Sequence, residues 1–244
     1  MELETSAGWL AAADVDPQVT RLRPDYTAVV IVAGGLRPGP AGEDTDALLR
    51  DAERVAAKTL SGGAPEDIPQ VAAWREAYRA FGAKPQRTRP SVEALLRRAG
   101  DGLPRIDRIT DIYNAISVRH LLPVGGEDLD SYRGPARLVR ADGSEPFDTV
   151  SGGDRVTEHP EPGEVVWRDE LGVTCRRWNW RQCVRTRITQ STTSAVFILD
   201  GLGALGQEGL AAAAADLTGQ LAELHEGAWT ASRQIPGPAA GQGA

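Results

Sequence analysis

The segment IDRITDIYNAISVRHLL, residues 106–122, separates two parts of the chain that differ in sequence pattern. Apolar side chains recur in it at the spacing of one helix face: Ile109, Ile112, Tyr113, Ile116 and Leu121. Pro123 and the pair Gly125-Gly126 then interrupt the periodicity, as is usual at a helix C-terminus. The pattern therefore predicts a helix, on which Asp111 and Asn114 can face the same neighbour because they are three residues apart.

The chain before this helix is predicted to be mainly helical. YTAVVIVAGG, residues 26–35, has the β-branched run and the glycine stop of a buried strand. Three segments with helical spacing follow, at about 44–60, 68–84 and 87–102. The second and third segments have glycine near their ends, as helices commonly do.

Beyond residue 130 short β-like pieces replace the helical periodicity, and clusters of Gly, Pro and Asp separate them. A last helix is predicted at about 207–226. Helices first and strands later predict an α+β fold rather than a doubly wound sheet. We expect a single domain over residues 1–232, with an N-terminal strand and helices to about 130, a β-rich half at 131–203 and the C-terminal helix. A disordered tail is expected at 233–244, because that segment is rich in Gly, Pro and Ala.

Composition narrows the classes of function. A net charge of −7 argues against a protein that coats nucleic acid non-specifically, because that affinity comes from neutralising phosphates. No apolar run reaches the roughly 18 residues of a membrane span, and the N-terminus lacks the pattern of a signal peptide. We therefore expect a cytoplasmic protein with no membrane partner. Two cysteines eight residues apart, without a histidine pair nearby, favour buried side chains over a disulfide or a zinc site, and no metal or cofactor is expected.

The charge is unevenly distributed along the chain. Residues 75–108 contain nine Lys or Arg residues against four acids. Such a segment is either a set of solvated helix faces or a patch for an anionic partner such as the end of an RNA. The candidate RNA-binding residues are Arg75, Arg79, Lys84, Arg87 and Arg89.

A second basic stretch, CRRWNWRQC at residues 175–183, contains two tryptophans and no acid. Read as one strand, it places alternate side chains on opposite faces. One face then carries Arg176, Trp178, Trp180 and Gln182, and the other carries Cys175, Arg177, Asn179, Arg181 and Cys183. Since neither face is plainly apolar, we expect one face in the core and the other in the wall of a polar pocket.

Familiar catalytic signatures do not occur in the chain. There is no H-E-x-x-H, G-x-S-x-G, P-loop or kinase motif. The three histidines, His120, His159 and His225, are scattered, and nothing in the sequence supports a Ser-His-Asp triad.

Four blocks of sequence, in this order, resemble the B3/B4 domain, which is best known as the editing module of the phenylalanyl-tRNA synthetase β subunit. They are WREAYRAFGAKPQRTRPSVEALLRR, LPRIDRITDIYNAISVRHLLPVGGEDLD, GEVVWRDELGVTCRRWNWRQCVRTRIT and VFILDGLG. The resemblance extends over about residues 20–226 and identifies the chain as similar to free-standing members of that family. It implies a layered sandwich of mixed or antiparallel sheet with flanking helices, and a pocket between the helix at Asp111 and the strand at Trp178.

The resemblance is carried by three local matches and has two departures. Residues 111–114, 122–128 and 172–178 match the family's D-V-T-N-like, Q-P-L-H-A-F-D-like and G-V-L-A-L-A-G-like runs. The family's pocket histidine falls at Gly125, and its pocket glutamate falls near Gln182 or Cys183. The tryptophans and arginines of RRWNWR stand where the synthetase has small residues.

The resemblance implies a deacylase that hydrolyses a mischarged aminoacyl-tRNA, with the aminoacyl 3′ end of tRNA as the partner. For this reaction the candidate catalytic residues are Asp111, Asp128 or Glu164 to position a water, and Arg181, with Asn179 as the alternative, to stabilise the oxyanion. The candidate substrate-binding residues are Asn114, Trp167, Arg168, Trp178, Asn179 and Trp180. Several of these polar residues could instead be ordinary caps or ion pairs.

Two other functions remain open at this point. The same pocket could bind an amino acid, a nucleoside or a tRNA end without catalysis, or the tryptophans of RRWNWR could form an interface with another protein.

Overall fold

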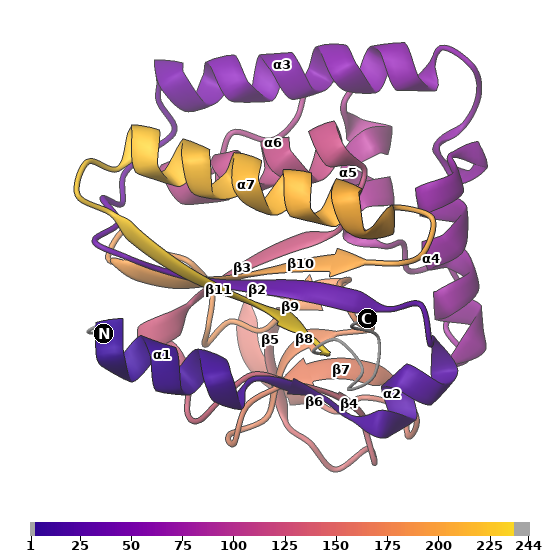
Figure 1. The fold of residues 1–244 in the computed structure, drawn as a ribbon. Helices are drawn as coiled ribbons and strands as arrows, with labels where there is room; N and C mark the ends of the chain where they lie inside the picture. Colours follow the sequence, from indigo (N-terminus) through magenta and orange to yellow (C-terminus); the bar gives the residue numbers. More distant parts are fainter. Residues whose placement is uncertain (1–2, 237–244) are drawn as a thin grey trace, which may run out of the picture.

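Residues 3–236 are described by a computed structural model (Figure 1). The helices are α1 (Leu3–Ala12), α2 (Pro17–Leu22), α3 (Glu43–Leu60), the 3-10 turn η1 (Pro65–Asp67), α4 (Pro69–Ala80), α5 (Ser91–Arg98), α6 (Arg108–His120), the 3-10 turn η2 (Leu129–Ser131) and α7 (Gly206–Leu224). The strands are β1 (Asp14–Val15), β2 (Thr27–Gly34), β3 (Val124–Asp128), β4 (Arg137–Arg140), β5 (Phe147–Ser151), β6 (Asp154–Glu158), β7 (Val165–Arg168), β8 (Val173–Arg176), β9 (Arg181–Gln182), β10 (Ser194–Gly201) and β11 (Trp229–Ile235).

The strands form two main sheets. One has four antiparallel strands in the order β11-β2-β10-β3, and the other has five strands in the order β1-β4-β7-β8-β9. The second sheet is mixed, because β1 pairs with β4 in parallel. Helices α6 and α7 cover one face of the four-stranded sheet, α3 lies above them, and the five-stranded sheet lies beneath the other face (Figure 1). The α+β prediction is confirmed.

Strand β10 explains why this architecture needs two covered faces. All eight of its residues are buried, so the strand reads as a continuous apolar run rather than an alternating one. Val196 and Ile198 pack into the cluster between the two sheets, whereas Phe197 and Leu199 pack into the cluster beneath the helices. Because side chains alternate along a strand, Asp200 lies on the same face as Ile198 and points between the sheets.

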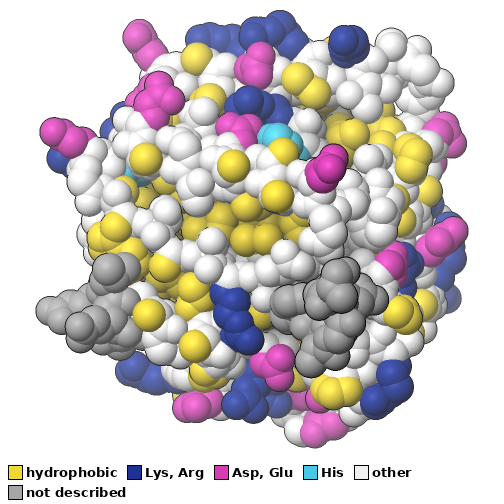
Figure 2. Space-filling model, viewed as in Figure 1, with side chains coloured by type: hydrophobic (Ala, Val, Ile, Leu, Met, Phe, Trp, Pro, Cys, Tyr) yellow, Lys and Arg dark blue, Asp and Glu magenta, His cyan; other side chains and the backbone are white. Residues whose placement is uncertain are grey.

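The surface at the β11 edge of the sheet is hollowed. Hydrophobic side chains line this hollow below α7, and charged side chains of both signs surround it (Figure 2). This edge is opposite β3, since β11 and β3 are the two outer strands of the sheet.

The structure corrects the prediction for CRRWNWRQC. The segment is a hairpin rather than one strand: β8 ends at Arg176, and β9 begins at Arg181. Arg177 and Trp178 between them have positive φ angles of 48° and 69°, a left-handed conformation that reverses the chain. The strict alternation of faces predicted for these residues is therefore wrong.

The structure also corrects the C-terminal prediction. Strand β11 follows α7 and pairs with β2 along its whole length, from Trp229 to Ile235. The segment from 233 to 235 is therefore ordered sheet, not part of a tail. Of the rest of the predicted tail, Pro236 follows the strand directly, and residues 237–244 lie outside the described residues.

Candidate functional site

A cavity of about 300 Å³ lies at the β3 edge of the four-stranded sheet, between helix α6 and the β8–β9 hairpin. Its walls come from α5, the loop before α6, α6 itself, β3, β7, β10 and the hairpin. Four aromatic side chains line it: Tyr113, Trp167, Trp178 and Trp180. This is the place that the sequence resemblance implied for a pocket.

Two adjacent glycines in β3 have different surroundings, and one of them, Gly125, lines the cavity. A Cβ atom on Gly126 would lie 2.7 Å from the Tyr113 ring, so helix α6 packs directly against the bare backbone there. A Cβ atom on Gly125 would meet only the Gln182 amide, at 3.4 Å. The same amide donates a hydrogen bond of 2.9 Å to the Gly126 carbonyl and ties the hairpin to β3. The glycines thus permit close packing on one face and open space on the other.

Glu127, the next residue in β3, is buried at the inner side of the cavity. The Tyr132 hydroxyl donates to its Oε2 at 2.5 Å, and the Thr186 hydroxyl donates to the same oxygen at 2.9 Å. Burial raises the pKa of Glu127 to about 7, although both hydroxyl hydrogen bonds oppose this shift. The carboxyl group therefore exchanges its proton near neutral pH, as a general base requires.

Asp200 of β10 is a second buried carboxyl group in the same cavity. It accepts hydrogen bonds from the Tyr26 hydroxyl at 2.6 Å and from the Asn179 amide at 3.4 Å. Burial raises its pKa to about 7, again against the effect of these donors. The cavity thus contains two carboxyl groups that are each partly protonated at neutral pH.

Sequence reasoning missed both carboxyl groups. Asp200 carried a signal, because it is a lone acid in the apolar run SAVFILDG, and a buried charge needs dedicated partners. Glu127 carried less signal, because it sits in an acidic turn beside Asp128 and its burial depends on distant segments.

The hairpin turn is held in its left-handed conformation by Glu164. The carboxylate accepts from the Arg177 backbone N–H at 3.1 Å and from the Arg176 guanidinium at 2.9 and 2.7 Å. The Trp178 N–H donates to the Val165 carbonyl at 2.7 Å. Trp178 is consequently turned into the core, where its ring meets those of Tyr26 and Trp74 edge-on at 5.0 and 5.3 Å.

Arg181 provides the cationic wall of the cavity. Its guanidinium lies 4.8 Å from the centre of the Trp180 ring, and Arg177 lies 4.5 Å from the same ring. One terminal nitrogen of Arg181 binds Glu158 at 2.5 Å, whereas its buried Nε has no hydrogen-bond partner among the described residues. Ser91 Oγ, which also lines the cavity, is likewise buried without a partner in the described chain. Such buried, unpaired groups are uncommon in folded proteins.

A sequence model of the B3/4 domain matches residues 73–205, which is more than half of the chain. The protein belongs to the B3/4 domain family. The matched region contains the cavity's helix α6, strand β3 and hairpin.

Among solved structures, the chain is similar to an N-terminal fragment of the phenylalanyl-tRNA synthetase β subunit from Pyrococcus horikoshii. The identity is 15% and the TM-score 0.45, over 93% of this chain and 54% of the other. The B3/4 chain thus spans about half the length of that fragment. The search of curated proteins found no match.

Six of the predicted site residues line the B3/4 cavity. They are Asn114, Trp167, Trp178, Asn179, Trp180 and Arg181. Among them Trp178 is completely buried and packed on by other rings, so it contributes a fixed wall and not a stacking platform.

Four other predicted residues have structural contacts elsewhere. Asp111 is buried and accepts from the Ile106 N–H at 2.8 Å, and its burial raises the pKa of the carboxyl group. Asp128 accepts from Thr192 at 2.6 Å and lines a separate polar groove. Glu164 holds the hairpin as described, and Arg168 lies 3.6 Å from Glu145. None of the four lines the cavity.

The predicted RNA-binding residues divide into two groups. Arg75 and Arg89 pair with the buried carboxylate of Glu93, at 2.8 and 3.5 Å, and so stabilise the contact between α4 and α5. The side chains of Arg79, Lys84 and Arg87 are exposed, and no ion pair involves them within residues 3–236. Arg75 is largely enclosed by its pair, whereas Arg89, although paired, is exposed like the second group.

The described residues include no cluster of three or more His, Cys, Asp or Glu side chains that could hold a metal ion. Cys175 and Cys183 are both buried as free thiols. Of the helices in the described chain, none is both long enough and apolar enough to cross a membrane.

Proposed function

We propose that this B3/4 protein hydrolyses the ester of an aminoacyl group carried on the 3′ end of tRNA. The observation that carries the proposal is the placing of a buried carboxyl group, Glu127, and the side chain of Arg181 in the lining of one cavity. An aminoacyl ester is already labile, so a positioned water and a stabilised oxyanion suffice without a covalent nucleophile.

In this reaction Glu127 takes the place that sequence reasoning gave to Asp111, Asp128 or Glu164. Ionised Glu127 accepts a proton as the water oxygen attacks the ester carbonyl, and Arg181 and Asn179 donate to the oxyanion. The bond between the carbonyl carbon and the ribose oxygen then breaks, and the proton passes to that oxygen. The products are a free amino acid and a tRNA with a free 3′ end.

The surface around the cavity supports an RNA partner. Arg98 of α5 lines the cavity and is exposed, as are Arg79 in α4 and Lys84 and Arg87 in the loop between α4 and α5. These cations would neutralise phosphates near the 3′ end. The ring of Trp180 is half-buried, and two guanidinium groups pack against it. It is the aromatic side chain that we expect to stack on a base or on the aminoacyl side chain.

The test is single-turnover hydrolysis of a panel of mischarged aminoacyl-tRNAs by the wild-type protein and by Glu127→Gln. We expect the variant to lose about 100-fold or more in rate, because general-base catalysis contributes about that much. Glu145→Gln is the matched control: Glu145 is also buried and accepts two backbone N–H bonds, yet it does not line the cavity. Equal rates for all three proteins would contradict the proposal.

Glu127 and Asp200 already accept hydrogen bonds within the protein. This favours a second function, in which the cavity binds a ligand without catalysing a reaction. Hydroxyl groups hold Glu127 and Asp200 in place, and the position of the family's histidine is Gly125, which has no side chain. A binding module would show no hydrolysis of any ester in the panel. It would instead show a rise in melting temperature with free amino acids or nucleosides, following mass action.

A further inference from the structure

The two hydroxyl groups that hold Glu127 come from separate loops. Tyr132 follows η2, and Thr186 lies in the long segment between β9 and β10. The Thr186 carbonyl also accepts from the Asp128 N–H at 2.8 Å, beside Glu127 itself. The position of the Glu127 carboxyl group therefore depends on how these two loops are held relative to β3.

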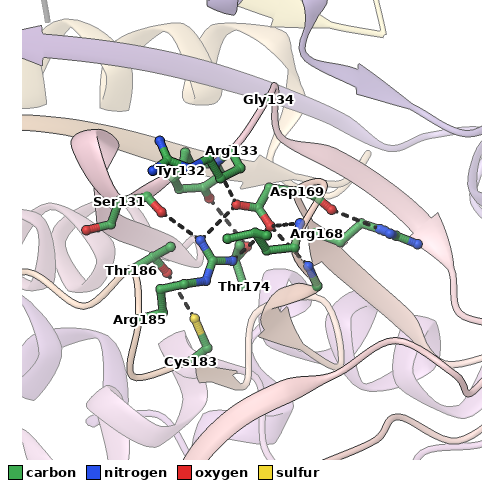
Figure 3. A network of polar contacts seen from close by, with 12 residues as sticks. Ser131, Tyr132, Arg133, Gly134, Arg168, Asp169, Thr174, Cys183, Arg185 and Thr186 are labelled. Carbon is green, nitrogen blue, oxygen red and sulfur yellow. Dashed lines mark hydrogen bonds and ion pairs between the residues drawn. The ribbon is translucent and has the colours of Figure 1, made fainter.

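An ion pair joins the loops immediately next to both hydroxyl residues. Arg185, the neighbour of Thr186, binds the two oxygens of Asp169 at 2.9 and 2.8 Å and donates to the Ser131 carbonyl at 2.6 Å. Asp169 in turn accepts from the Arg133 N–H at 2.8 Å. Ser131 and Arg133 flank Tyr132, so the pair fixes the chain on both sides of that residue (Figure 3).

The pair is anchored to the five-stranded sheet as well. Asp169 accepts from the N–H groups of Leu171 and Gly172 at 2.9 and 3.1 Å in the turn between β7 and β8. The Asp169 side chain is completely buried, and that of Arg185 is 21% exposed. A paired, bidentate geometry of this kind is the strongest form of side-chain ion pair, and losing one partner leaves a buried charge uncompensated.

We propose that Asp169 and Arg185 are positioning residues for Glu127, which hold the Tyr132 and Thr186 hydroxyls against its carboxyl group without entering the cavity. Neither residue lines the cavity. The effect of the pair on catalysis rests on the proposed function. Its effect on the Glu127 carboxyl group does not, and it is measurable without any substrate.

Besides holding the two hydroxyls, the charges of Asp169 and Arg185 affect the pKa of Glu127. Besides Asp169, the titratable groups that interact with Glu127 include Tyr113, Tyr132, Cys175 and Cys183, which are uncharged near neutral pH. The negative charge of Asp169 raises the pKa of Glu127, and the bound Arg185 offsets that charge. Removing either partner alone therefore changes the field at Glu127, and the sign of the change differs between the two.

The experiment is a carboxyl carbon NMR titration of Glu127 in the full chain, with the signal assigned by its absence in Glu127→Gln. Arg185→Gln leaves the Asp169 anion and loosens both hydroxyls, so the midpoint is expected to rise by about half a pH unit or more. Asp169→Asn also breaks the ion pair and loosens both hydroxyls, but it removes a nearby anion and leaves the Arg185 cation, so its midpoint is expected to lie below that of Arg185→Gln. The double variant restores the charge balance and is expected to lie between the two.

Arg133→Gln is the matched control, because it removes an exposed cation from the same loop while the Arg133 backbone bond to Asp169 remains. Its titration is expected to match the wild type. No rise in the midpoint of Arg185→Gln, or a rise in Asp169→Asn at least as large, would overturn the inference. Should Arg185→Gln fail to fold, Arg185→Lys decides: it keeps the charge but not the two-point contact with Asp169, so a midpoint equal to that of the wild type contradicts the proposal.

Catalysis provides a separate readout. With a hydrolysed ester from the panel, Arg185→Gln is expected to lower kcat about tenfold with little change in KM and to move the pH profile with the NMR midpoint. If the wild type hydrolyses no ester while the NMR shifts occur as expected, the positioning inference holds and the proposed hydrolase function fails. If hydrolysis occurs but neither variant moves the titration, the function holds and the positioning inference fails.

Discussion

At the scale of single residues, the structure separates two tryptophans that look equivalent in sequence. Trp178 and Trp180 are both in RRWNWR, and alternation places them on one face of a strand. The left-handed turn instead buries Trp178 completely among aromatic rings and leaves Trp180 half-buried beside two arginines. The first is thus a core residue and the second a cavity residue.

Substituting each tryptophan by alanine tests this distinction. Trp178→Ala is expected to lower the free energy of unfolding by about 3 to 5 kcal/mol, because it leaves a large hole in a packed core. Trp180→Ala is expected to cost about 1 kcal/mol, the usual value of a cation–π contact, and to weaken ligand or substrate binding. Urea denaturation measures both, and equal losses of stability would contradict the assignment.

At the scale of elements, the contact between α6 and β3 depends on two neighbouring glycines with different surroundings. The ring of Tyr113 occupies the space over Gly126, whereas cavity space and the Gln182 amide lie over Gly125. A strand normally has low tolerance for glycine, so a pair of them in β3 indicates a close approach of other groups. Here one side is a helix and the other is the candidate site.

The two glycines provide a matched pair of substitutions. Gly126→Ala is expected to lower the free energy of unfolding by about 1 to 3 kcal/mol, because the new methyl group overlaps the Tyr113 ring. Gly125→Ala is expected to keep wild-type stability and to reduce activity or binding by narrowing the cavity. Thermal melts and the hydrolysis assay measure these effects together. A stable Gly126→Ala protein would show that α6 does not pack on β3 as described.

The local sequence of the β8–β9 hairpin explains why a single strand was predicted there. β-Rich composition and alternation extend through CRRWNWRQC, and the sequence has no Gly, Pro or Asp to signal a turn. The reversal is made by non-glycine residues that Glu164, from a different part of the chain, holds by hydrogen bonds. The pattern of residues 175–183 alone therefore gives no indication of the contact with Glu164.

At the scale of the whole molecule, the two sheets bring Glu127 and Asp200 into one cavity although they are far apart in sequence. Each carboxyl group is buried, so the folded protein retains its proton at pH values where the unfolded chain has released it. Unfolding therefore releases protons between the ordinary carboxyl pKa values, near 4, and about 7. The contribution of these two groups makes the protein less stable as the pH rises through this window.

This gives a pH prediction with a definite sign. Raising the pH from 5 to 7 is expected to lower the urea midpoint, with each carboxyl group contributing a loss of the order of 3 kcal/mol over the full window. The variant Glu127→Gln/Asp200→Asn is expected to show a flatter dependence, because its amides do not titrate. The buried His225, whose pKa is lowered by burial, works in the opposite direction and is present in both proteins. A wild type with the same slope as the variant would contradict the raised pKa values.

Short-range pattern was enough to predict the helices α3 to α6 and the strand β2, since periodicity and glycine or proline stops act within a few residues. The family came from the sequence in another way, through the resemblance of four blocks to the B3/B4 domain, and the match over residues 73–205 confirms it. Strand β11, the left-handed hairpin turn and the burial of Glu127 and Asp200 depended on contacts between distant segments. Register, burial and the pKa of a carboxyl group are properties of the assembled neighbours of a residue, and a local sequence pattern does not specify those neighbours.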